Sequence, residues 1–173
     1  MSRERATFRD KLASVVLMSQ LFDAIAGLAN ACEPLPGIVT GGQPTAEHLA
    51  ALKRAGCDVV LDLREPMEPR PYRAPDAVRA AGLEYVNIPF GQGEIGDATF
   101  EAALRTVREL SGRKRVLVHC SSGSRVGAAL IPYLMLDKGM SEEDAVAEAM
   151  RVGMRDAGLM QAAVDYVRRK TTR

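Results

Sequence analysis

Short apolar runs alternate with amphipathic segments along the chain, and this alternation predicts an α/β fold. The runs at 37–40, 58–64, 84–89 and 116–118 are typical of short, buried strands. Helical spacing or helix-start signals cover the segments between and after them, at 46–55, 76–81, 98–110, 125–138, 142–151 and 159–170. The pattern therefore predicts a single α/β domain with a central, mostly parallel sheet flanked by helices.

The first 31 residues form a separate segment in this pattern. Apolar positions from Phe8 to Asn30 recur at close to helical spacing, which predicts a helix packed on the domain formed by residues 32–173. A secretory signal is the alternative, because basic residues precede an apolar run and Ala29-Asn30-Ala31 resembles a cleavage site. Gln20 and Asp23 interrupt that run, so we favour the packed helix. The run is also too short and too polar to span a membrane.

The stretch from Arg115 to Gly127 carries the strongest chemical signal. It predicts a buried strand, a tight loop at residues 120–124 and a helix start. Such a loop directs backbone N–H groups and the positive end of a helix at one point, where an anion binds. The same field favours a thiolate at Cys120, and the planar guanidinium of Arg125 can grip two oxygens at once. We therefore predict attack by a sulfur anion on a bound phosphorus or sulfur centre, in a pocket that the sulfur of Cys120 faces.

His119-Cys120, a short Ser/Gly loop and Arg125 resemble the signature of cysteine-dependent tyrosine and dual-specificity protein phosphatases. The order Gly-Gly-Gln-Pro-Thr (41–45), helix, hydrophobic strand and Leu63-Arg64 is similar to the bacterial tyrosine-phosphatase-like group of that superfamily, and the resemblance spans roughly residues 35–165. It implies a dual-specificity-phosphatase-like fold and a cysteinyl-phosphate intermediate. It also implies Cys120 as the nucleophile, a phosphate held by Arg125 and by the loop residues Ser121, Ser122, Gly123 and Ser124, and His119 as an orienting neighbour.

Two features of the loop depart from that signature and leave alternatives open. Four residues separate Cys120 from Arg125, where most of these enzymes have five, and four is also the spacing associated with rhodanese sulfurtransferases. Val126 stands where the family usually has a hydroxyl residue that stabilises the departing thiolate, a role that Ser121, Ser122 or Ser124 could take over. A sulfurtransferase with a Cys120 persulfide, or a catalytically degenerate phosphate-binding module, is therefore an alternative to the phosphatase.

The general acid is the least determined part of the predicted site. In the dual-specificity family it lies in the loop after the strand at 84–89, near Gly91 or Gln92, and neither residue donates a proton usefully. Glu94 and Asp97 are the remaining candidates, although Asp97 directly precedes a predicted helix and is also expected as its N-cap. The proline-rich loop 65–75 is a candidate wall of the same cleft, and we expect Asp62, Arg64 and Glu65, at the end of the preceding strand, to form structural ion pairs.

The amino-acid composition limits the classes of partner that the protein is expected to bind. A net charge of +1 and the absence of Trp give no basis for nucleic-acid or membrane binding. The three cysteines lack metal-ligand spacing, so we expect no metal, no cofactor, a reducing cytoplasmic location, and structural roles for Cys32 and Cys57. The expected partner is a phosphorylated protein or a small phosphate ester.

Overall fold

The strands of the central sheet are ordered β1-β2-β5-β3-β4 in the computed structural model, which describes residues 20–91 and 93–172. β2, β5, β3 and β4 run parallel, and β1 pairs antiparallel with β2 at one edge. This confirms the predicted mostly parallel sheet. The strands are β1 (Cys32–Leu35), β2 (Ile38–Gly41), β3 (Val59–Asp62), β4 (Glu84–Asn87) and β5 (Val116–His119).

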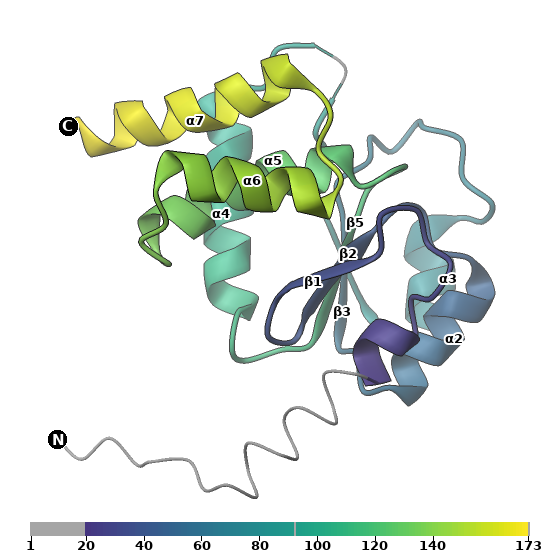
Figure 1. The fold of residues 1–173 in the computed structure, drawn as a ribbon. Helices are drawn as coiled ribbons and strands as arrows, with labels where there is room; N and C mark the ends of the chain where they lie inside the picture. Colours follow the sequence, from purple (N-terminus) through teal and green to yellow (C-terminus); the bar gives the residue numbers. More distant parts are fainter. Residues whose placement is uncertain (1–19, 92, 173) are drawn as a thin grey trace, which may run out of the picture.

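Helices cover both faces of the sheet, with α2 and α3 on one side and α4 to α7 on the other (Figure 1). Their bounds are α2 (Ala46–Arg54), α3 (Ala74–Ala80), α4 (Asp97–Leu110), α5 (Ser124–Leu136), α6 (Glu142–Val152) and α7 (Ala157–Thr171). Successive strand residues point to opposite faces, so Val116 and Val118 of β5 join one core cluster and Leu117 joins the other. The apolar runs of the sequence are therefore buried on both faces, as parallel sheets require.

Two elements differ from the sequence prediction. β1 was not among the predicted strands. Pro34 lies within this strand and is tolerated there because β1 is an edge strand. α3 begins at Ala74 rather than Asp76, since Pro75 occupies the first turn, where its missing N–H costs nothing.

The segment before β1 packs against the α2 and α3 side of the sheet. Residues 20–23 are helical and turns follow, while the predicted helix over residues 8–19 lies outside the described residues. Leu21, Ile25 and Leu28 are buried in the same cluster as Val39, Val60 and Leu117. The domain boundary at residue 31 stays a prediction. Within the described ranges, no helix combines the length and apolar character needed to cross a membrane.

Candidate active site

The loop after β5 turns sharply into α5 and is built around Gly123. This residue has φ +98°, a left-handed conformation that side chains disfavour, and it confirms the predicted sharp backbone at this position. A Cβ here would also lie 3.1 Å from Asn30 Cβ and 3.2 Å from the Val152 carbonyl oxygen. The Gly123 N–H donates a hydrogen bond to the sulfur of Cys120 at 3.0 Å, so the loop wraps around the thiol.

Cys120 is more deeply placed than the sequence led us to expect. It has 0% exposed surface and belongs to the core cluster, so the expectation of a sulfur facing an open pocket is wrong for this structure. The cause lies in its neighbours, because the loop folds back over the sulfur through Gly123 and the guanidinium of Arg125 also interacts with it. The sulfur therefore lies beneath the loop, in contact with the Gly123 N–H and the Arg125 guanidinium.

Arg125 is held by a carboxylate that the sequence did not single out. Glu68 accepts hydrogen bonds from Nη1 (2.5 Å to Oε1) and Nη2 (2.9 Å to Oε2) of Arg125. The Phe90 carbonyl accepts from Nη1 and the Ser121 Oγ from Nη2, each at 3.1 Å. These contacts fix the plane of the guanidinium and occupy the edge formed by its two terminal nitrogens.

Glu68 lies in the loop between β3 and α3, which we predicted as a candidate wall of the cleft. None of the described residues that line the cleft belongs to this loop, so it supports Arg125 from outside the cleft. Arg64 Nε donates to Glu68 Oε2 at 3.0 Å, so two arginines share this carboxylate. The hydrogen bonds from Arg125 are the main reason that the pKa of Glu68 falls to about 2, with further lowering by the backbone N–H of Glu65 and by Arg64. Glu68 is therefore ionised at neutral pH. The proline-rich composition marked the loop, but nothing in the sequence distinguished Glu68 from its acidic neighbours.

A buried ion pair anchors that loop to the sheet. Arg70 Nη2 lies 3.0 Å from Asp62 Oδ2, and Arg70 Nη1 donates to the carbonyl oxygens of Glu65, Pro66 and Glu68. Asp62 and Arg64 thus take part in ion pairs, as predicted, whereas the same prediction for Glu65 is wrong, because its side chain forms no ion pair with another described residue. A buried aspartate at the end of β3 holds the loop through Arg70 in the conformation that presents Glu68 to Arg125.

His119 is buried beneath the loop, at the end of β5. Its Nδ1 lies 3.2 Å from the carbonyl oxygen of Cys120, and its Nε2 lies 3.7 Å from Asp62 Oδ1. Burial lowers the pKa of His119, an effect that the nearby Asp62 partly opposes. A neutral imidazole with its proton on Nδ1 can hold the Cys120 carbonyl in place.

Residues from the start of the chain brace the other side of the loop. Asn30 Nδ2 donates to the Ser122 carbonyl at 2.6 Å, and the Gln43 N–H donates to the Ser121 carbonyl at 3.1 Å. A Cβ at Gly42 would lie 2.7 Å from the same Ser121 oxygen, so only glycine permits this close approach. The Gly-Gly-Gln segment is therefore a support for the loop. Asn30 was missed because the sequence placed it in a helix or a cleavage site.

A cleft with a volume of about 510 Å³ opens over the loop. Glu94 lines it together with Arg125, so one candidate acid shares a cavity with the arginine that is predicted to bind the anion. The side chains of α7 close the opposite wall. The cleft is lined by Gly91, Gly93, Glu94, Ile95, Ser121, Ser122, Ser124, Arg125, Asp156, Gly158, Leu159 and Ala162.

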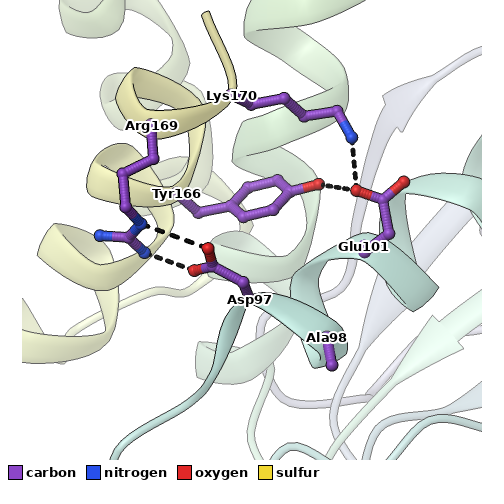
Figure 2. Close-up of a pocket in the computed structure, with 6 residues that line it drawn as sticks. All are labelled: Asp97, Ala98, Glu101, Tyr166, Arg169 and Lys170. Atoms are coloured by element: carbon purple, nitrogen blue, oxygen red, sulfur yellow. Dashed lines mark hydrogen bonds and ion pairs between the residues drawn. The ribbon is translucent and has the colours of Figure 1, made fainter. Parts of the chain in front are cut away.

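Asp97 lies in a different cavity, between α4 and α7 (Figure 2). Its Oδ1 is 2.5 Å from Arg169 Nη2, and beside it Glu101 accepts hydrogen bonds from Tyr166 and Lys170 (Figure 2). The N-cap of α4 is Gly96, so the prediction that Asp97 caps this helix is wrong. Asp97 is instead its first residue, where a negative charge is favourable next to the helix N-terminus.

The loop serines differ in their partners. Ser121 Oγ lies next to Arg125, whereas Ser124 Oγ accepts a hydrogen bond from the Arg155 N–H at 3.2 Å. Val126 is completely buried in α5 and takes part in core packing. Ser121 is thus the loop hydroxyl with a direct contact to the guanidinium.

The other two cysteines lie outside the site formed by the loop. Cys32 and Cys57 are buried and free, and burial raises the pKa of the Cys57 thiol to about 11. Within residues 20–91 and 93–172, no group of three or more His, Cys, Asp or Glu side chains is arranged to hold a metal ion.

Comparison with known proteins decides the family. Residues 31–166 match the model of a phosphatase family described as the dual-specificity-type protein tyrosine phosphatase fused to NAD⁺ kinase. The chain belongs to this family. It is accordingly a phosphatase of the cysteine-dependent tyrosine and dual-specificity class, as the loop signature predicted. No curated protein matches the sequence.

Solved structures of other phosphatases share the fold. A putative phosphatase from Shewanella putrefaciens has a TM-score of 0.72 at 22% identity, with 86% of this chain and 97% of that chain covered. TpbA from P. aeruginosa in complex with phosphotyrosine has a TM-score of 0.61 at 21% identity, covering 83% and 90%. The catalytic domain of the PP-IP phosphatase SIW14 from S. cerevisiae has a TM-score of 0.67 at 18% identity, covering 84% and 93%.

Proposed function

We propose that this phosphatase hydrolyses phosphate monoesters of the phosphotyrosine and dual-specificity type through a cysteinyl-phosphate intermediate on Cys120. The observation that supports this most directly is the placement of the Cys120 sulfur between the Gly123 N–H and the Arg125 guanidinium, under a cleft that Ser121, Ser122 and Ser124 line. N–H donors and a guanidinium around a nucleophilic sulfur are what an in-line attack on a phosphate requires.

The proposed reaction has two steps. The Cys120 thiolate attacks phosphorus, the bond between phosphorus and the leaving oxygen breaks, and that oxygen takes a proton from Glu94. A water molecule then gives a proton to the Glu94 carboxylate and attacks the phosphocysteine, the phosphorus–sulfur bond breaks, and inorganic phosphate and the thiolate are released with Glu94 protonated again. Glu94 is our candidate acid because it shares the cleft with Arg125, whereas Asp97 is paired with Arg169 in another cavity.

Glu68 has a positioning role in this proposal. It binds Nη1 and Nη2 of the guanidinium, so Arg125 is held in one orientation, in which it also interacts with the Cys120 sulfur. His119 and Asn30 orient the loop through the carbonyl oxygens of Cys120 and Ser122.

A Cys120→Ser variant tests the nucleophile. We expect it to lose measurable hydrolysis of p-nitrophenyl phosphate, while the matched Cys57→Ser variant, altered at a buried cysteine outside the site, keeps the parent rate. Acid quenching during turnover should trap phosphate on the parent protein and not on Cys120→Ser. A Cys120→Ser protein with the parent rate would refute the proposal.

The four-residue spacing between Cys120 and Arg125 supports a second candidate, a sulfurtransferase that carries a persulfide on Cys120. Thiocyanate release from thiosulfate and cyanide, measured beside phosphate release, separates the two reactions. The complete burial of Cys120 supports a third candidate, a phosphate-binding module. Tight vanadate binding without product in either assay would select that module.

A further inference from the structure

The charges of the cleft disfavour a substrate with more than one phosphate. Among the described residues that line it, Arg125 is the cation, while Glu94 and Asp156 carry carboxylates. One phosphate can pair with Arg125, but a second phosphate in the same cleft would meet the Asp156 carboxylate and would compete with the leaving oxygen for the proton of Glu94. Like charges a few ångströms apart in a partly enclosed site repel strongly. The cleft therefore fits a singly phosphorylated group with a neutral or cationic surrounding.

A methionine hollow lies next to the cleft. We use this name for the cavity of about 180 Å³ that is lined by Met150, Met154, Arg155, Asp156, Ala157 and Met160. Met150 is 51% exposed, so an apolar side chain of a bound partner can reach it. Methionine side chains are flexible and polarisable, and they adapt to apolar groups of different shape.

The first turn of α7 separates the two cavities. Asp156, its N-cap, lines both of them, while Leu159 faces the cleft and its neighbour Met160 faces the hollow. The helix rises only about 1.5 Å per residue, so this turn is about 5 Å long. An extended peptide advances about 3.3 Å per residue, so it crosses the turn within one to three residues.

We propose that the substrate is a protein with a singly phosphorylated side chain in the cleft and an apolar side chain, one to three residues away, in the methionine hollow. This inference rests on the proposed phosphatase function and adds a recognition site to it. The two cavities adjoin at Asp156, which lines both, and this selects the occupant, because a polypeptide that continues from the cleft across the first turn of α7 can place a second side chain at the hollow. A small phosphate ester is too short to do so.

Synthetic phosphotyrosine peptides test the site with the full chain. Leucine is placed in turn at each of the three positions before and after the phosphotyrosine, in a peptide that otherwise has glycine there. We expect leucine in at least one position to raise kcat/KM about tenfold, the size expected for partial burial of such a side chain. Met150→Gln and Met160→Gln should abolish this gain. Met67→Gln, the same change at a 91% exposed methionine that lines neither cavity, should retain it.

Hydrolysis of p-nitrophenyl phosphate is the internal control, because this small ester does not reach the methionine hollow. A parent-like rate on this small ester in all three variants, together with loss of the leucine gain in the two hollow variants, supports it. An active enzyme with equal rates on all peptides overturns it, and so does a higher kcat/KM for an inositol polyphosphate than for every peptide. No hydrolysis of any substrate by the parent protein overturns the proposed function itself.

Discussion

Glu68 and Arg125 are the residue pair on which the site depends. The carboxylate binds Nη1 and Nη2 of the guanidinium, which also interacts with the Cys120 sulfur. Arg64 shares the same carboxylate, and Arg70 holds the loop that carries it. A lysine in place of Arg125 could not reproduce this arrangement, because a point charge lacks the planar fork of donors.

Removing the charge of Glu68 should disorient Arg125. We expect Glu68→Gln to lower kcat/KM for p-nitrophenyl phosphate by about 10- to 100-fold, the range for losing a hydrogen bond between charged groups, worth about 1.5 to 3 kcal/mol. In an Arg125→Lys background the same change should have little further effect, because the two residues act as one unit. Additive losses in this double-mutant cycle would contradict the positioning role.

Glu94 and Asp97 can be separated by the leaving group. If Glu94 protonates the leaving oxygen, Glu94→Gln should lower kcat about 100-fold for phenyl phosphate, a poor leaving group, and much less for p-nitrophenyl phosphate. Asp97→Asn should leave both rates within about twofold, because its side chain faces Arg169. The reverse pattern would assign the acid to Asp97.

At the scale of elements, two glycines show how closely the segments around the loop approach one another. A Cβ at Gly127 of α5 would lie 2.5 Å from the Ala149 carbonyl oxygen and 2.8 Å from Met154 Cβ, so α5 and α6 pack backbone to backbone. A Cβ at Gly42, after β2, would press on the Ser121 carbonyl at 2.7 Å. The first contact belongs to the core and the second to the catalytic loop.

Alanine at these two positions should therefore have different effects. We expect Gly127→Ala to lower the free energy of unfolding by about 1 to 3 kcal/mol through overpacking, with kcat of the folded fraction close to the parent value. Gly42→Ala should lower kcat about tenfold or more, because even a 1 Å displacement of a catalytic group is costly. Urea denaturation and initial rates on the same preparations measure both quantities. Equal losses of kcat in the two variants would contradict the assignment of Gly127 to core packing and of Gly42 to the support of the loop.

At the scale of the whole molecule, the carboxyl ends of parallel strands bring the site together. β5 carries Cys120 and Arg125 into place, the loop after β3 brings Glu68, and the loop after β4 brings the Phe90 carbonyl. The loop after β5, which leads into α5, therefore lies at the carboxyl edge of a sheet that helices cover on both faces (Figure 1).

The depressed pKa of Glu68 predicts how stability responds to acid. A carboxylate whose pKa falls from 4.5 to about 2 on folding contributes stability that is complete above pH 4.5 and is lost as the pH falls toward 2. Glu68→Gln lacks this contribution. The difference in the free energy of unfolding between the parent and Glu68→Gln should thus shrink between pH 4.5 and 2. A constant difference over this range would show that the ion pair does not stabilise the fold.

The order of elements followed from the sequence because their signals are local. Val116, Leu117 and Val118 are apolar in succession, Thr45 caps α2 and Ser141 caps α6, and each pattern depends only on nearby residues. β1 was missed because four residues with a proline carry no strand signal of their own. Its position is set by pairing with β2.

What the sequence determined by itself was the fold class, the sulfur-and-guanidinium loop and the family that this loop resembles. Adjacent residues carry that information, since Cys120, Gly123 and Arg125 lie within six positions. Only the tertiary structure decided that Glu68 holds Arg125 across 57 positions, that Asn30 braces Ser122, and that Asp97 faces away from the cleft. These contacts join segments far apart in the chain, and their partners are selected by the packing of the sheet and helices rather than by any local pattern.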